Sequence, residues 1–234
     1  MKSFLVRLWV FLRRFEARVL IGLFLLAAAG FSFLEIADDM AEGDTRAIDS
    51  RLILALREPG DLNNPIGGHG IEEAVRDITA LGGTTLVVVI TLVAILAFLF
   101  HRRPLHALVM GGCVVAASMS SQFTKAFFSR PRPDLVPHDV YVYSGSFPSG
   151  HSTMSTAAFL TLAMLIASLE VKRRSKALAY TLAALVILGV GFSRVYLGVH
   201  WPSDVLAGWC LGSAWALLGW LALRAMGAQV RGSG

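Results

Sequence analysis

Charged residues are scarce in this chain, at 16% of its 234 residues, whereas 55% of the residues are hydrophobic. Soluble globular domains usually contain about 25% charged residues, so this composition excludes an ordinary soluble domain. The net charge of +5 is not gathered into a compact basic face, which argues against a nucleic-acid partner. The composition is that of an integral membrane protein.

Cysteine is also rare, and both cysteines, Cys113 and Cys210, lie within apolar stretches. In such surroundings a cysteine is usually a small buried hydrophobic residue, which argues against a disulfide, metal or redox pair. No internal repeat or low-complexity tract is present either. The chain is therefore interpreted as a single membrane domain over residues 1–234.

What the sequence does contain is hydrophobic runs. A helix needs about 20 apolar residues to cross roughly 30 Å of hydrocarbon. The first run follows three arginines, as in a signal peptide, but it continues through Ile36 and is long for a cleaved signal, so a retained span is favoured. The sequence predicts an all-α integral membrane fold of six transmembrane helices, at residues 19–37, 84–100, 105–124, 149–169, 177–196 and 203–225.

The basic residues are distributed unevenly between the two sides of these spans. The side that holds the N-terminus carries 13 of the 21 Lys and Arg residues but only two of the 16 acidic residues. Because Lys and Arg are enriched in cytoplasmic loops, both termini are predicted to face the cytoplasm.

One long connection, residues 38–83, lies on the opposite side and is called the outer loop. Residues 47–58 show the alternation of apolar and charged residues expected of a short interfacial helix, residues 61–70 are interpreted as a turn, and residues 71–81 as a second short helix. A packed cap over the helix bundle is favoured for this loop over a rim that guides lipid.

Three polar segments lie at the outer ends of spans three to six. The first, residues 125–133 (KAFFSRPRP), contains Lys125 and Arg132, a point charge and a planar fork that suit phosphate oxygens. The alternative is that such cations only extend towards the membrane interface, and Arg130 is interpreted in that way. A charge at such depth is costly, which favours a function.

The second segment is residues 148–151 (PSGH), just before an apolar run. Ser149 is a good N-cap and Gly150 permits close backbone approach, so a helix is predicted to begin here. The positive end of that helix would form an anion site beside His151. A lone histidine is more often structural, so this segment is weak evidence by itself.

The third segment is residues 193–204 (SRVYLGVHWPSD). Arg194 can hold phosphate, and the carboxylate of Asp204, four residues after His200, can fix the imidazole tautomer that leaves Nε2 as a nucleophile. The alternative is a structural His–Asp cap. A serine hydrolase is poorly supported because the segment around Ser149 reads GSFPSG, not G-x-S-x-G.

Taken together, these residues resemble the tripartite signature of the type 2 phosphatidic acid phosphatase superfamily, in its membrane-bound lipid phosphatase branch. The core motifs cover residues 125–204 and no signature position departs from the pattern. The resemblance implies a phosphatase with His200, His151 and Asp204 as catalytic residues and no metal or other cofactor. It also implies that the phosphate is bound by Lys125, Arg132, Ser149, Gly150 and Arg194.

The expected activity is hydrolysis of a lipid phosphate or diphosphate through a phosphohistidine, at the periplasmic face of a bacterial-type inner membrane. Candidate substrates are phosphatidylglycerol phosphate, phosphatidic acid, undecaprenyl diphosphate and phosphorylated lipid A. A lipid phosphotransferase with the same intermediate is a second hypothesis, and a non-catalytic lipid-phosphate carrier is a third. The sequence leaves the lipid and the oligomeric state open.

Overall fold

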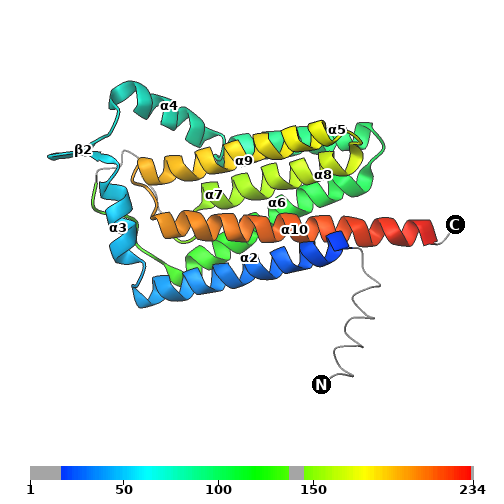
Figure 1. The fold of residues 1–234 in the computed structure, drawn as a ribbon, viewed down its shortest axis with the longest axis horizontal. Coiled ribbons are helices and arrows are strands. Elements are labelled where there is room, and N and C mark those ends of the chain that lie inside the picture. Colours follow the sequence, from blue (N-terminus) through cyan, green and yellow to red (C-terminus); the bar gives the residue numbers. More distant parts are fainter. Residues whose placement is uncertain (1–16, 137–144, 233–234) are drawn as a thin grey trace, which may run out of the picture.

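The structure is a computed structural model that describes residues 17–136 and 145–232, and it consists mainly of long helices (Figure 1). The fourth predicted span is composed of three consecutive pieces, with a short π-helix in the middle. The long helices are α2 (Ala17–Glu42), α5 (Thr84–Phe100), α6 (Pro104–Phe128), α9 (Arg173–Tyr196) and α10 (Pro202–Gly232), and the composite helix is α7 (Gly150–Ser155), η1 (Thr156–Leu160) and α8 (Thr161–Leu169).

Within the part of the chain that the structure describes, five helical segments are long and apolar enough to cross a membrane. Helix α5 has 17 residues and meets α4 (Gly68–Ala80) at a bend of 46°, so this pair supplies a sixth span when it is counted as one. The bend lies at Gly82 and Gly83, where no side chain restricts the close approach of the backbone to its neighbours. The predicted all-α membrane class is confirmed.

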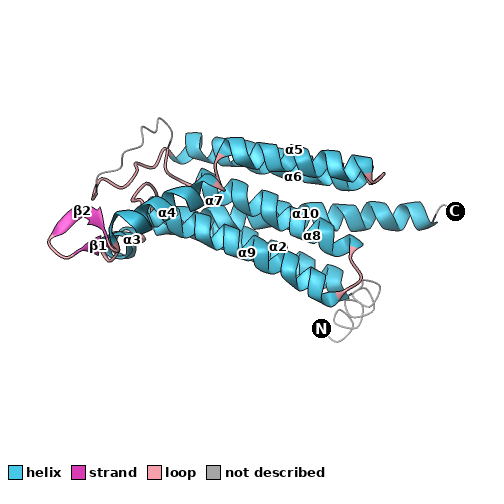
Figure 2. Cartoon of the chain, turned by 90° about the horizontal axis from the view of Figure 1, so that it is seen from above, coloured by secondary structure: helices cyan, strands magenta, loops and turns pink. Residues whose placement is uncertain are grey.

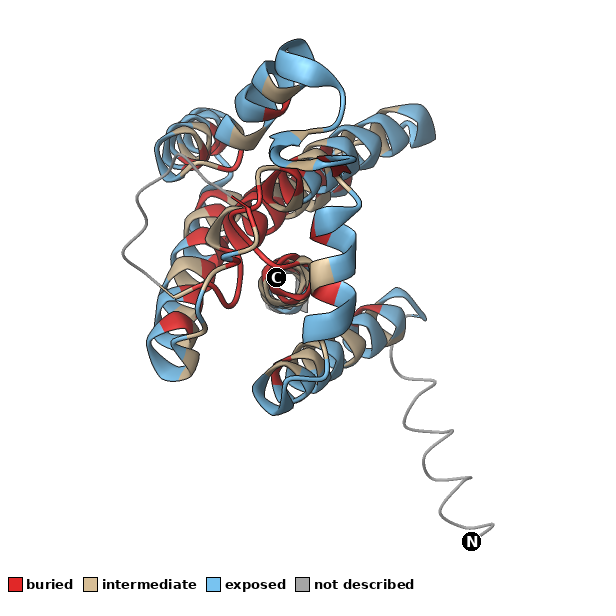
Figure 3. Ribbon diagram, turned by 90° about the vertical axis from the view of Figure 1, so that its left-hand side faces the viewer, coloured by how far each residue is buried: buried red, intermediate tan, exposed pale blue. Residues whose placement is uncertain are grey.

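The distribution of side chains is that expected in lipid. Large apolar side chains such as Phe24 and Phe123 are 72% and 74% exposed. Small polar residues are buried instead, among them Ser152, Thr153 and Ser155 at the start of the composite helix. Figure 3, seen from the outer end of the bundle, shows buried residues gathered on the central helices and exposed ones at the periphery.

Helix α10 is the central packing element. A Cβ atom on Gly212 would lie 2.6 Å from the carbonyl oxygen of Thr153, so this glycine lets α10 and the composite helix pack with their backbones close together. Helix α2 packs along α10, where Gly22 lies against the ring of Trp220. The last turns of α10 project beyond the other helices (Figure 2).

The outer loop is more structured than predicted, and two of its predictions are wrong in part. The first helix, α3 (Arg46–Leu54), ends four residues early, and the predicted turn contains a strand, β2 (Asp61–Pro65), paired antiparallel with β1 (Arg57–Glu58). After the helix ends, Arg57 turns inward and donates to the carbonyl oxygen of Tyr196 at 2.8 Å. The second predicted helix is present as α4.

The chain direction brings the three polar segments to one end of the bundle (Figure 1). Helices α6 and α9 end there, and α7 and α10 begin there, at the end that also carries the outer loop. The fold thus places the predicted site residues beneath this loop.

Candidate active site

The predicted site residues come together from four helix ends. Lys125, Arg132 and Arg194 lie close enough to His151 to act on it electrostatically, and Arg132 and Arg194 act likewise on His200. Lys125, Arg194 and His200 are all nearly or fully buried. Segments that are up to 80 residues apart in the sequence therefore form one polar cluster.

His200 and Asp204 are in contact, although the two residues do not lie on one helical turn. Helix α10 begins at Pro202, so His200 precedes it and folds back over its first turn. The Nδ1 atom of His200 lies 3.3 Å from Oδ2 of Asp204, which also accepts the backbone N–H of Trp201 at 3.0 Å and the hydroxyl of Ser146. The carboxylate thereby fixes both the imidazole and the chain that carries it.

The other ring nitrogen of His200 faces a cation. Nη1 of Arg132 lies 3.1 Å from Nε2, and because a guanidinium can only donate, Nε2 carries the lone pair and Nδ1 the proton. Burial lowers the pKa of His200 to about 3, and the charges of Arg194 and Arg132 act in the same direction while the hydrogen bond to Asp204 opposes them. The imidazole is neutral at physiological pH, as a nucleophile must be.

The two predicted phosphate-binding cations of residues 125–133, Lys125 and Arg132, are held by backbone carbonyls. Lys125 lies in the last turn of α6, and its Nζ donates to the carbonyl oxygens of Gly145 at 2.8 Å and Ser146 at 3.3 Å. Arg132 donates to the carbonyl oxygen of Val199 at 2.8 Å. Burial lowers the pKa of Arg132 and nearby Asp204 opposes that effect, so the guanidinium stays charged. Both cations are thus fixed beside the histidines.

Ser149 caps the helix as predicted. Its Oγ accepts the backbone N–H of Ser152 at 3.4 Å, and α7 begins at the next residue. A Cβ atom on Gly150 would lie 3.7 Å from Cε of Lys125, so this glycine faces the lysine. His151, in the first turn, packs against Gly82 and Gly83, which bring the α4–α5 bend to the site.

Arg194 has a partner that sequence reasoning missed. It lies in the last turn of α9, and its Nη1 donates to the hydroxyl of Thr79 on α4 at 3.0 Å. Its Nε is buried and has no hydrogen-bond partner among the residues that the structure describes. The outer loop therefore reaches the candidate phosphate-binding cations directly.

The interpretation of Arg130 as an interfacial cation is wrong. Its side chain is 9% exposed, and Nη1 donates to Oδ1 of Asp204 at 2.6 Å while Nη2 donates to Oδ2 of Asp49 at 2.9 Å. Asp49, which sequence reasoning missed, precedes buried Ile53 by one helical turn and so shares its inward face in the structure.

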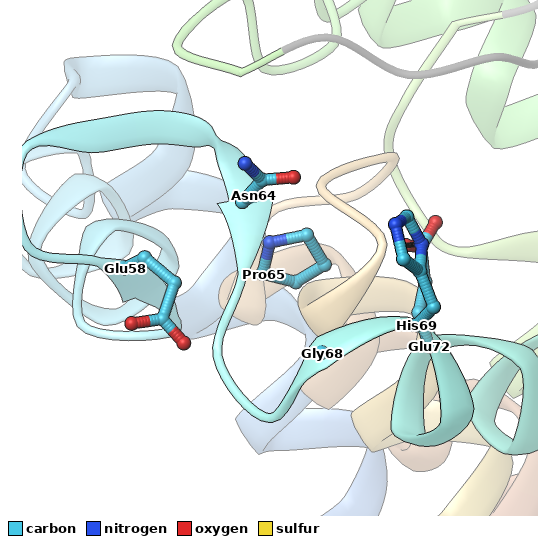
Figure 4. Close-up of a pocket in the computed structure, with 6 residues that line it drawn as sticks. All are labelled: Glu58, Asn64, Pro65, Gly68, His69 and Glu72. Carbon is cyan, nitrogen blue, oxygen red and sulfur yellow. Dashed lines mark ion pairs between the residues drawn. The ribbon is translucent and has the colours of Figure 1, made fainter.

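The outer loop also contains a pocket of about 240 Å³ whose lining includes neither His151 nor His200 (Figure 4). Glu72, on its α4 side, is already paired with Arg76 at 2.8 Å. No group of three or more His, Cys, Asp or Glu placed to hold a metal ion is found in residues 17–136 and 145–232. The pocket is lined by Glu58, Asn64, Pro65, Gly68, His69 and Glu72.

Comparison with known proteins relates this geometry to a family. The PAP2 superfamily profile matches residues 106–227. Phosphatidylglycerophosphatase B of Bacillus subtilis is 32% identical over 143 residues, which cover 61% of this chain and 70% of that protein. Lipid A 4'-phosphatase of Porphyromonas gingivalis is 34% identical over 139 residues, which cover 53% of this chain and 56% of that protein.

A solved structure shows the same arrangement of helices. The crystal structure of a transmembrane PAP2 type phosphatidylglycerolphosphate phosphatase from Bacillus subtilis aligns with a TM-score of 0.73 at 25% identity. The alignment covers 88% of this chain and 96% of the other. Because 88% of the chain is more than residues 106–227 span, the likeness in fold extends beyond the part of the chain that the family profile matches.

Proposed function

The chain belongs to the PAP2 superfamily, and from that premise we propose that it is a membrane phosphatase that hydrolyses a lipid phosphate or diphosphate through a phosphohistidine. The observation that carries the proposal is the pair of contacts on His200. Asp204 lies at Nδ1 and leaves the lone pair on Nε2, which faces the cluster of cations. These contacts support a role for His200 as an oriented, neutral nucleophile beside an anion site.

In the first proposed step, Nε2 of His200 attacks phosphorus and the bond from phosphorus to the leaving oxygen breaks. His151, carrying a proton taken up with the anionic substrate, donates that proton to this oxygen, which departs as an alcohol or a phosphate. Lys125, Arg132 and Arg194 stabilise the charge on the equatorial oxygens, together with the backbone around Ser149 and Gly150. Such preorganised charge usually supplies most of the acceleration in phosphoryl transfer.

In the second step, water attacks the phosphorus of the phosphohistidine as His151 takes a proton from it. The N–P bond breaks, inorganic phosphate leaves, and His200 returns to its neutral state. Asp204 stabilises the proton on Nδ1 throughout. General acid and base assistance of this kind contributes roughly 10² to 10⁴ in rate.

The site is proposed to face the periplasm of a bacterial-type inner membrane. The bias of Lys and Arg towards the opposite end of the spans supports this orientation. Labelling tests it with Pro59→Cys, placed in the exposed hairpin turn of a chain whose Cys113 and Cys210 are replaced by serine. A membrane-impermeant thiol reagent should label this cysteine in intact spheroplasts. Labelling only after lysis would show that the hairpin faces the cytoplasm and would contradict the proposed orientation.

The activity is tested with purified protein in detergent containing a chelator. Phosphate release is measured from phosphatidylglycerol phosphate, phosphatidic acid, undecaprenyl diphosphate and phosphorylated lipid A, side by side. His200→Ala should abolish release, and His69→Ala, at a histidine that is 99% exposed, serves as the matched control. Absence of release from all four lipids, or full turnover by His200→Ala, contradicts the proposal.

A further inference from the structure

A buried chain of charges links the outer loop to the proposed nucleophile. Arg130 bridges two carboxylates, Asp49 on α3 and Asp204 on α10, with N–O distances of 2.9 Å and 2.6 Å. The side chains of these two acids are 1% and 0% exposed. Oδ2 of Asp204, the oxygen that Arg130 does not contact, faces Nδ1 of His200.

Asp49 is itself held firmly. Its Oδ1 accepts the backbone N–H of Ser203 at 2.9 Å, and its Oδ2 accepts the Ser203 hydroxyl at 2.5 Å. The same hydroxyl accepts from Nη1 of Arg130 at 2.8 Å. Asp49 thus contacts both the guanidinium and the first turn of α10, the two elements that determine where the Asp204 carboxylate lies.

A guanidinium shared by two carboxylates differs from one bound to a single carboxylate. With Asp49 present, Arg130 presents one nitrogen to each acid, in a planar fork whose two ends are both fixed. Without the charge of Asp49, Nη2 keeps only the longer contact with the hydroxyl of Thr45 at 3.2 Å among the described residues, and the fork can turn both nitrogens onto Asp204. That rotation would draw the carboxylate away from His200 and neutralise more of its charge.

We propose that Asp49 is a positioning residue for the reaction: it holds Arg130 so that Arg130 orients Asp204, and Asp204 orients the imidazole of His200. The inference rests on the proposed function, because it takes His200 as the nucleophile. Asp49 lies in the outer loop, outside residues 106–227 that match the family profile. The outer loop therefore contributes to the chemistry as well as covering the bundle.

The test compares wild type with Asp49→Asn, which keeps the shape of the side chain and removes its charge. Asp49 contacts none of the proposed phosphate-holding side chains, so kcat should fall about 10- to 100-fold while KM changes less than about twofold, as expected for a misplaced reacting group. Asp44→Asn, at an exposed acid of the same loop, should leave both constants unchanged. An unchanged kcat, or a change confined to KM, overturns the proposal.

A double-mutant cycle separates positioning through Arg130 from a general loss of packing. If Asp49 acts through Arg130, then adding Asp49→Asn to a protein that already carries Arg130→Gln should lower kcat by less than about twofold. Full additivity overturns the proposal. If Asp49→Asn does not fold, Arg130→Lys provides the second test, because an ammonium lacks the fork that binds both acids and should show the same selective loss of kcat.

Trapping the intermediate distinguishes this inference from the function on which it rests. With a lipid phosphate labelled at phosphorus and a rapid quench, wild type should form an acid-labile, alkali-stable phosphoenzyme, and Asp49→Asn should form it 10- to 100-fold more slowly. If wild type forms none, the proposed mechanism fails. If both proteins form it at the same rate, the mechanism stands and the role of Asp49 is wrong.

Discussion

Arg132 donates to Nε2 of His200 across 3.1 Å, so the proposed nucleophilic atom is paired with a candidate phosphate-binding group. The same guanidinium nitrogen is anchored on the carbonyl oxygen of Val199, next to the histidine in the chain. A phosphate that enters the site would take over the donors of Arg132 and release the Nε2 lone pair. Phosphate binding would then free the nucleophilic atom in the same step, because both compete for the N–H groups of Arg132.

Arg132→Lys should therefore lower kcat/KM, although it keeps the charge. An ammonium cannot reach both the phosphate oxygens and the Val199 carbonyl in the fixed geometry of the guanidinium fork. A drop of about 10² to 10³ is expected, as for loss of one oxyanion donor. Steady-state phosphate release measures it. Arg51→Lys, at an exposed cation of the outer loop, is the matched control, and equal activity of the two variants would contradict a phosphate contact by Arg132.

The low pKa of His200 predicts that acid destabilises the protein. The unfolded chain binds a proton near pH 6.5, whereas burial holds the folded pKa at about 3, so the unfolded state binds more protons between these values and stability falls as the pH drops from 6.5 towards 3. Between pH 7 and pH 5 wild type should lose about 2 kcal/mol more than His200→Gln. Thermal unfolding midpoints in detergent measure the difference. Parallel losses in the two proteins would mean that His200 is not held neutral.

The contact between Thr79 and Arg194 predicts a role for α4 in phosphate binding. Thr79→Val removes the hydroxyl that accepts from Nη1 while keeping the shape of the side chain, so Arg194 loses one support. We expect KM to rise roughly three- to tenfold, in line with the loss of one hydrogen bond. Thr85→Val, at an exposed position of α5, is the control. A KM within error of wild type would show that Arg194 is held by other contacts.

The bend between α4 and α5 should not tolerate a side chain. A Cβ atom on Gly82 would lie 2.4 Å from Cγ1 of Val190 and 3.2 Å from the carbonyl oxygen of His151, so Gly82→Ala forces the helices apart. Overpacking of this kind costs about 1 to 3 kcal/mol. Gly70→Ala, with nothing within 4 Å, should be neutral or stabilising. The measurement is the thermal unfolding midpoint of each variant, and equal midpoints for Gly82→Ala and Gly70→Ala would contradict the tight contact at Gly82.

The spans can be predicted from the sequence because a helix that crosses the hydrocarbon of a membrane needs an apolar run of a minimum length, and such runs are visible in the sequence. The predicted end of the fifth span at Tyr196 is the end of α9, and the predicted start of the fourth span lies one residue before the start of α7 at Gly150. The meeting of the three polar segments was also predictable, because alternating spans bring the corresponding helix ends to one side. Ser149 as an N-cap follows from local chemistry alone.

The partners from the outer loop were not predictable in the same way. Asp49 lies 81 residues before Arg130, and Thr79 lies 115 residues before Arg194, so each contact depends on how the loop folds over the bundle. The hairpin was missed because its strands are short and largely polar, without the alternation that marks a strand. Long-range polar contacts in a loop leave no periodic signal.

The π-helix η1 divides the fourth span into two halves, α7 and α8, whose side-chain faces are rotated relative to each other about the helix axis. A π-helical turn accommodates one more residue than an α-helical turn, so it offsets the face of α7, with His151, from the face of α8 by about 100°. Each half can then be oriented for its own surroundings, one for the polar cluster and the other for the bilayer and neighbouring helices. A single-residue deletion within η1 would make the helix regular and turn His151 away from the cations Lys125, Arg132 and Arg194.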